Sequence, residues 1–192
     1  MEIEYEATFA NIDKDEVRAM LRKARATLIR PEFLQKRIPF YLPGEQRAGR
    51  FVRVRDEVDK ITMSFKSFDG DKIEDQSELC LEVDNFDKAV ELLELIGCRK
   101  KSYQESKREI WKLDNVEIMI DEWPFLEPFV EVEGKNEEEV RRVSEKIGFD
   151  YSRALFSAAA VLYQKKYNIP DDKINAEPLV VFDMENPFLK YI

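Results

Sequence analysis

Two segments of the sequence place charged side chains at every second residue, opposite an apolar row. Arg53 and Arg55 alternate with valines in RFVRVRD, and Glu131 and Glu133 alternate with valines in FVEVEG. A period of two is typical of a β-strand, whose successive side chains point to opposite faces. Arginine binds phosphate oxygens through several N–H donors, and carboxylates bind hard divalent cations. These residue types on strand faces therefore indicate metal-assisted chemistry on a phosphate compound.

The signs of the charges are sorted along the chain. Acids dominate the first and last strand-like segments, as at Glu4, Glu6 and Asp121. Bases dominate the stretch from Arg47 to Lys66. An ordinary solvated sheet face also alternates apolar and polar residues, and each strand taken alone fits that simpler interpretation. Such a face would mix signs, because opposite charges pair across strands. The sorting instead favours a charged face that lines an enclosed tunnel.

The elements that must position these residues form an α+β pattern. We expect eight strands in two strand-helix-three-strand units, then two further helices and a short terminal strand. The expected strands are 2–9, 33–42, 49–56, 60–67, 78–83, 106–113, 116–121 and 129–133, and the expected helices are 13–26, 86–96, 137–148 and 152–167. The apolar stripes of the helices would cover the outside of an antiparallel β-barrel and leave the charged face inside.

The composition narrows the function classes. The chain has 192 residues, no histidine, two cysteines and a formal net charge of -9. Without histidine, histidine-based catalytic triads and zinc-hydrolase sites are excluded, and the negative charge argues against general nucleic-acid binding. Cys80 and Cys98 form no metal or disulfide motif, and no segment is apolar enough to enter a membrane. We therefore expect a soluble, cytoplasmic protein of one domain, residues 1–192.

Six segments carry a family resemblance. EYEATF, RFVRVRD, ITMSFKS, SKREIW, IMIDEWP and FVEVEG, in this order and spacing, resemble the CYTH superfamily, the triphosphate tunnel metalloenzymes. The core of the resemblance comprises residues 2–148, followed by a C-terminal helix and tail over 149–192. The resemblance implies an eight-stranded antiparallel β-tunnel with helices outside, in which basic side chains and one or two Mg²⁺ or Mn²⁺ ions hold a triphosphate.

The resemblance also implies roles for individual residues. The implied metal ligands are Glu4, Glu6, Asp121, Glu131 and Glu133. The implied substrate-binding residues are Arg53, Arg55, Lys66, Arg108 and Lys107, and the implied catalytic residues are Glu6, Lys66 and Arg108. Strand alternation lets only one of Lys107 and Arg108 face the tunnel, and we favour Arg108. Glu78 matches an acidic position on the fifth strand. The family signature ExExK is matched at its two acids, whereas Thr8 replaces its lysine.

The electrostatics of such a site agrees with a metal. Two carboxylates 4 Å apart repel by ~4 kcal/mol at an effective dielectric constant near 20, and a dication with oxygen ligands relieves this repulsion. Three functions stay open. We expect metal-dependent hydrolysis of inorganic, thiamine or nucleoside triphosphate. The alternatives are a class IV adenylyl cyclase reaction, which gives cyclic AMP and pyrophosphate, and non-catalytic binding of polyphosphate or a nucleotide.

One absence weighs against the cyclase, because class IV cyclases typically carry a histidine-containing motif and this chain has no histidine. The expected partner is a small-molecule triphosphate, with no membrane and no general nucleic-acid binding. The sequence leaves a homodimer open.

Overall fold

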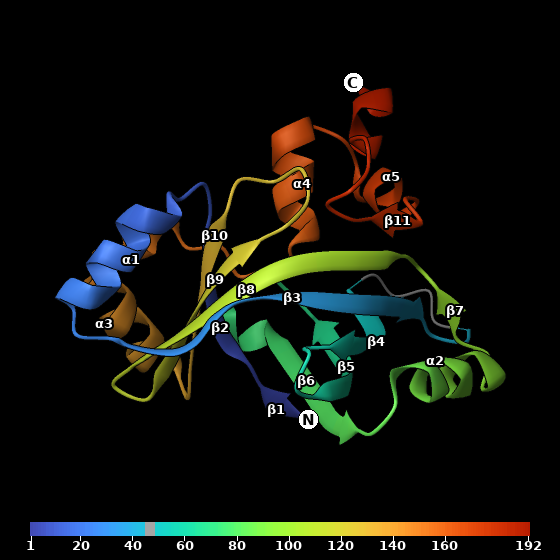
Figure 1. Ribbon diagram of the computed structural model, residues 1–192, viewed down its shortest axis with the longest axis horizontal. Coiled ribbons are helices and arrows are strands. Elements are labelled where there is room, and N and C mark those ends of the chain that lie inside the picture. Colours follow the sequence, from blue (N-terminus) through green and yellow to red (C-terminus); the bar gives the residue numbers. More distant parts are fainter. Residues whose placement is uncertain (45–48) are drawn as a thin grey trace.

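The computed structural model describes residues 1–44 and 49–192, and a curved β-sheet dominates it (Figure 1). Arg47, the first residue of the basic stretch, lies outside the described residues. The strands are β1 (Glu2–Ile3), β2 (Tyr5–Phe9), β3 (Thr27–Tyr41), β4 (Arg50–Asp56), β5 (Ile61–Phe68), β6 (Gln76–Val83), β7 (Arg99–Lys100), β8 (Tyr103–Leu113), β9 (Val116–Glu122), β10 (Phe129–Gly134) and β11 (Leu179–Val180). Their order in the sheet is β1-β6-β5-β4-β3-β8-β9-β10-β2, with β7 attached to β3 and β11 attached to β8.

The N-terminal segment nearly closes this sheet into a barrel. β1 pairs with β6 at one edge, and β2 pairs with β10 at the other, both antiparallel. Glu4 lies between the two strands and donates its backbone N–H to the Gln76 carbonyl oxygen at 3.0 Å. The Gln76 side chain donates in turn to the carbonyl oxygen of Glu6 at 3.2 Å. The predicted antiparallel tunnel is confirmed, although its described path has nine strands rather than eight, because the first predicted strand divides at Glu4.

Three helices cover the outside of the barrel: α1 (Lys14–Lys23), α2 (Phe86–Leu95) and α3 (Glu137–Ile147). Each begins at a residue whose side chain accepts hydrogen bonds from backbone N–H groups of the first turn, namely Asp13, Asn85 and Asn136. Such N-caps satisfy donors that have no partner inside the helix. These caps and the apolar stripes explain why the three helices lie close to their predicted ranges.

The apolar rows of the strands point outward, under these helices. Val130 and Val132 of β10 pack in one core with α1 and α3, and Val54 of β4 packs in a second core with α2. Alternation then turns the intervening charged residues to the inside. The charged rows therefore point to the inside of the barrel, as the predicted tunnel requires.

Two elements differ from the prediction. β3 begins at Thr27 rather than at residue 33. It pairs with β8 along its length, and the register of this pairing shifts near Arg30. The helix expected over 152–167 is limited to α4 (Ala160–Tyr167), preceded by one 3₁₀ turn at Tyr151–Arg153. Between them, Leu155 exchanges two backbone hydrogen bonds of 2.9 Å with Thr8 of β2. These bonds with the barrel hold the chain extended where the alanine-rich sequence favours a helix.

Residues 156–192, here called the C-terminal cap, lie against one side of the barrel, above β3 and β8 in Figure 1. The cap contains α4, α5 (Asp171–Asn175), β11 and a 3₁₀ turn at Pro187–Tyr191. Its own apolar core packs against the connection between β9 and β10, through residues that include Tyr163, Phe188 and Trp123. Over residues 1–44 and 49–192, no helix is both long and apolar enough to span a membrane.

Candidate active site in the tunnel

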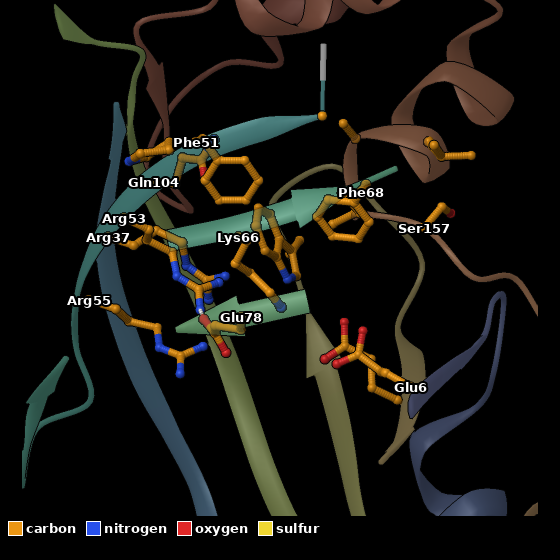
Figure 2. Close-up of a pocket in the computed structure, with 18 of the residues that line it drawn as sticks. Glu6, Arg37, Phe51, Arg53, Arg55, Lys66, Phe68, Glu78, Gln104 and Ser157 are labelled. Carbon is orange, nitrogen blue, oxygen red and sulfur yellow. Dashed lines mark hydrogen bonds and ion pairs between the residues drawn. The ribbon is translucent and has the colours of Figure 1, made fainter. Parts of the chain in front are cut away.

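A cavity of about 560 Å³ occupies the inside of the barrel and extends beneath the C-terminal cap. Nine of the residues expected in the site line it: Glu4, Glu6, Arg53, Arg55, Lys66, Glu78, Arg108, Glu131 and Glu133. Figure 2 shows Arg53 and Arg55 on one wall, Glu6 on the opposite wall, and Lys66 and Glu78 between them. Opposite charges therefore face each other across one enclosed space.

Three expected residues do not line the cavity. Lys107 lies on the outer face of β8, where its ammonium is 3.5 Å from Glu122 and lies over the ring of Phe182. Its neighbour Arg108 faces inward, in the direction that strand alternation favours. Thr8 is buried on β2 beside β10. Thr8 carries no charge. Among nearby cations, Lys66 is the one whose positive charge lowers the pKa of Glu6 most.

Asp121, the third of these, lies behind Arg108. Its two carboxylate oxygens accept from Nε and Nη2 of Arg108, at 2.8 and 2.5 Å, and its exposed fraction is 1%. The same Nη2 donates to Glu131 at 2.5 Å. A bidentate contact of this kind fixes the plane of a guanidinium. In this arrangement Asp121 orients Arg108 toward the cavity, and both of its oxygens are engaged.

Two further ion pairs line the cavity. Lys66 Nζ lies 2.8 Å from Glu4, and Nη2 of Arg53 donates to Glu78 at 3.1 Å. Burial of Glu78 opposes ionisation, but the positive charges of Lys66 and Arg53 outweigh it and lower the pKa of Glu78 to about 2. Glu78 therefore stays ionised near neutral pH and balances positive charge on the basic wall.

The acidic wall is electrostatically different. Glu133 of β10 lies directly opposite Glu6 of β2, and Glu131 lies one inward position along β10. Burial raises the pKa of Glu6 to about 7, of Glu131 to about 8 and of Glu133 to about 7, and neighbouring carboxylates add to each rise. These three side chains therefore retain protons up to near-neutral pH, because burial in a poorly hydrated space disfavours their charged forms and nearby carboxylates add to that effect.

The donors of this wall suit a hard dication. All are carboxylate oxygens, which Mg²⁺ and Mn²⁺ prefer, and a bound dication favours the ionised form that burial opposes. Within the described parts of the chain, no three acidic or cysteine side chains are gathered closely enough to form a finished metal site. The residues thus fit such an ion in chemistry, while Glu4 and Glu131 are engaged with Lys66 and Arg108.

Sequence reasoning missed Arg37 and Trp123. Arg37 faces the cavity from β3, directly opposite Arg55 of β4, and Trp123 lines the cavity just after β9. The segment QKRIPFY around Arg37 contains a second cation and a proline, so its pattern does not single out the inward position. Only the pairing of β3 with β4 reveals that Arg37 extends the row of Arg53 and Arg55.

The cavity also has an aromatic end. Phe51 precedes Arg53 on the inward face of β4, and Phe68 follows Lys66 on that of β5. Their ring centroids are 6.4 Å apart, with an interplanar angle of 15°. Residues 156–161, at the start of the C-terminal cap, line the same end, where Figure 2 shows Ser157 near Phe68. The tunnel therefore combines a charged interior with an apolar mouth.

A nearly closed antiparallel barrel with opposed charged walls inside and helices outside defines the class of β-tunnel proteins. The chain belongs to the CYTH domain family, whose model matches residues 1–161. No curated protein sequence matches it significantly.

Solved structures share this fold. A conserved hypothetical protein from Pyrococcus furiosus has a TM-score of 0.70 at 20% identity and covers 83% of this chain and 99% of its own. A putative adenylate cyclase from Vibrio parahaemolyticus has a TM-score of 0.72 at 12% identity, with 85% and 98% covered. A putative adenylyl cyclase from Hippeastrum, described as having a dominant triphosphatase activity, has a TM-score of 0.57 at 15% identity, with 88% and 99% covered. At identities this low, the similarity shows a shared fold and does not show a shared activity.

Proposed function

We propose that this protein is a divalent-metal-dependent hydrolase of triphosphate-bearing small molecules. The observation that carries the proposal is the pair of opposed walls in one cavity, with arginines on β4 and carboxylates on β2 and β10. A triphosphate carries about four negative charges and cannot enter a carboxylate-lined space unless cations neutralise it. A site with both walls suits a triphosphate together with its metal ion.

The basic wall would bind the phosphate oxygens. Arg53 and Arg55 can each contact two oxygens, and the planar guanidinium loses little freedom when it does so. Nε of Arg53 is buried without a hydrogen-bond partner among the described residues. A buried donor left without a partner costs about 1–3 kcal/mol, and an anion in the cavity would remove that cost. Lys66, already between the two walls, would neutralise charge on the phosphoryl group that is transferred.

The acidic wall would hold the metal ion. Glu6, Glu131 and Glu133 are the carboxylates that best fit Mg²⁺ or Mn²⁺ by donor type and position, and the ion would polarise a phosphate oxygen as a Lewis acid. Glu6 and Glu133 have no ion-pair partner among the residues that the structure describes. Glu6 would also accept a proton from the attacking water, because its carboxylate faces the cavity from the opposite side to the arginines.

The shape of the cavity favours a triphosphate that carries an organic group. Its volume lies within the range of about 300–1,000 Å³ that is usual for small-molecule sites. This volume leaves room for an organic group beside three phosphates. The rings of Phe51 and Phe68 offer a planar apolar surface next to the basic wall. A nucleoside or thiamine triphosphate would place its ring there and its phosphates between the charged walls.

Product analysis tests this proposal. The protein is incubated with Mg²⁺ or Mn²⁺ and, separately, ATP, thiamine triphosphate and tripolyphosphate, and the products are separated by ion-exchange chromatography. We expect release of orthophosphate, faster from the organic triphosphates, and loss of activity in Glu131→Gln. Cyclic AMP with pyrophosphate would replace the hydrolase with a cyclase, and tight binding without turnover would indicate a binding protein.

A further inference from the structure

Arg37 is a buried cation that has no carboxylate partner. Its exposed fraction is 4%, and Figure 2 shows its guanidinium beside that of Arg53, directed into the cavity. Four other cations of the tunnel, two of them buried and two partly buried, are each paired with at least one carboxylate. The pairs are Arg53 with Glu78, Arg55 with Glu57, Lys66 with Glu4, and Arg108 with Asp121 and Glu131. Arg37 donates only to neutral groups in the described structure, the side chains of Gln35, at 2.7 Å, and Ser106.

The surroundings of Arg37 make this arrangement costly without an anion. Burial and the positive charges of Arg53, Arg55 and Arg108 all lower the pKa of Arg37. Isolated buried charges are strongly unfavourable in proteins unless they are paired. Among the described residues, no carboxylate lies within hydrogen-bonding distance of Arg37. A bound anion is the group that would balance it.

Two unpaired donors mark where that anion would lie. Nε of Arg37 and Nε1 of Trp123 are both buried without a hydrogen-bond partner among the described residues. The two side chains are stacked, with the guanidinium carbon 4.4 Å from the centroid of the Trp123 ring. Both residues line the cavity. Two unsatisfied N–H groups from different elements thus belong to one stacked pair at one wall of the tunnel.

The C-terminal cap holds this pair in place. The ring of Trp123 contacts Tyr163 of α4 edge-on, with centroids 6.5 Å apart, and Tyr163 packs on Phe188 at 4.7 Å. The Tyr163 hydroxyl donates to the Pro124 carbonyl oxygen at 2.7 Å, which fixes the chain directly after Trp123. The orientation of Arg37 therefore depends on a segment whose greater part lies beyond residue 161, where the family match ends.

We propose that Arg37 and Trp123 form an additional binding position for one phosphate group of the substrate, built from β3 and the β9–β10 connection and supported by the C-terminal cap. This inference rests on the proposed function, because it assigns a further substrate contact within the same tunnel. Arg37 is its charged donor. Trp123 adds a second N–H and keeps the guanidinium in the plane required for a two-oxygen contact.

Binding of tripolyphosphate without metal tests the pair directly. Titration calorimetry in EDTA compares wild type with Arg37→Gln, Arg37→Lys and the matched control Lys36→Gln, whose exposed side chain points outward from the adjacent position of β3. We expect Arg37→Gln to weaken binding by about tenfold or more, which is the loss of one charge-assisted hydrogen bond. Arg37→Lys is expected to recover part of it, and Lys36→Gln to bind as wild type does.

Tryptophan fluorescence supplies an independent readout. Trp111 lies in the outer core, where its Nε1 donates to Glu109 at 2.6 Å, so a change in emission on adding tripolyphosphate should come from Trp123. We expect that change to be absent in Trp123→Phe. In the hydrolysis assay, Arg37→Gln should raise KM by a larger factor than it lowers kcat.

Unaltered affinity in a folded Arg37→Gln, or a fluorescence change that persists in Trp123→Phe, would overturn the inference. Should Arg37→Gln fail to fold, Arg37→Lys and Trp123→Phe are compared with wild type in the same binding assay. The two proposals fail separately. Tripolyphosphate binding that depends on Arg37 but leads to no hydrolysis would reject the hydrolase and keep this site, whereas hydrolysis and binding indifferent to Arg37 would do the reverse.

Discussion

The three carboxylates of the acidic wall give the metal-free protein a distinctive dependence of stability on pH. In an unfolded chain Glu6, Glu131 and Glu133 lose their protons near pH 4.5, whereas in the fold their pKa values are about 7, 8 and 7. Between these limits the folded state binds more protons than the unfolded state. Raising the pH through this window therefore favours unfolding.

The magnitude follows from the protons involved. At pH 7 the folded protein keeps about half a proton on each of Glu6 and Glu133 and most of one on Glu131, or about two more than the unfolded chain. Each proton is worth about 1.4 kcal/mol per pH unit. Solvent at the open end of the cavity screens part of this, so we expect the free energy of unfolding to fall by about 1–2 kcal/mol per unit between pH 6 and pH 8. The effect is large beside a total of about 5–15 kcal/mol.

Histidine is the side chain whose ordinary pKa lies between pH 6 and pH 8, and this chain has none. The change in stability over this pH range can therefore be assigned to the three carboxylates. Urea denaturation, followed by tryptophan fluorescence in EDTA at several pH values, measures the slope. Glu131→Gln should reduce the slope by about half near pH 7.5, and Glu138→Gln, on the exposed side of α3, should leave it unchanged. A stability that is constant or rises from pH 6 to pH 8 would refute the assignment of three protonated carboxylates to one wall.

Other expectations concern single residues and the metal. Glu131→Gln and Arg53→Ala should each lower kcat/KM by about 100-fold or more while circular dichroism shows that the fold is kept, and a normal rate in either would remove that residue from the site. Arg108→Ala should lower kcat/KM far more than Lys107→Ala, since Lys107 lies outside the cavity; equal losses would contradict the placement of β8. Asp121→Asn should destabilise the protein by about 3 kcal/mol in urea denaturation, because the partly buried Arg108 would then keep only Glu131 as a carboxylate partner. EDTA should abolish hydrolysis and Mg²⁺ or Mn²⁺ should restore it, so activity that survives chelation would exclude metal dependence.

The inward and outward faces of the strands could be predicted because alternation is a local property. Val54 and Val130 lie in outer cores, and the charged residues between such positions line the tunnel. Helices with a capping residue and an apolar stripe were likewise predictable, as at Asp13 and Asn136. These features depend on a few neighbouring residues, which the sequence displays directly.

Features that depend on pairing between distant segments could not be predicted. The helix expected from residue 152 gives way to an extended segment because Leu155 bonds with Thr8, a contact absent from any local pattern. The position of Arg37 in the basic wall depends on the register of β3 with β4. Asp121 has the inward direction expected of a metal ligand, but its engagement with Arg108 becomes visible only when β8 and β9 are paired.

A crystal structure with Mg²⁺ and a non-hydrolysable nucleoside triphosphate analogue examines the two charged walls together. We expect the phosphates between the wall of Arg37, Arg53 and Arg55 and the wall of Glu6, Glu131 and Glu133, with the base beside Phe51 and Phe68. An analogue that binds outside the barrel at saturating concentration, with the tunnel free of phosphate, would contradict the account.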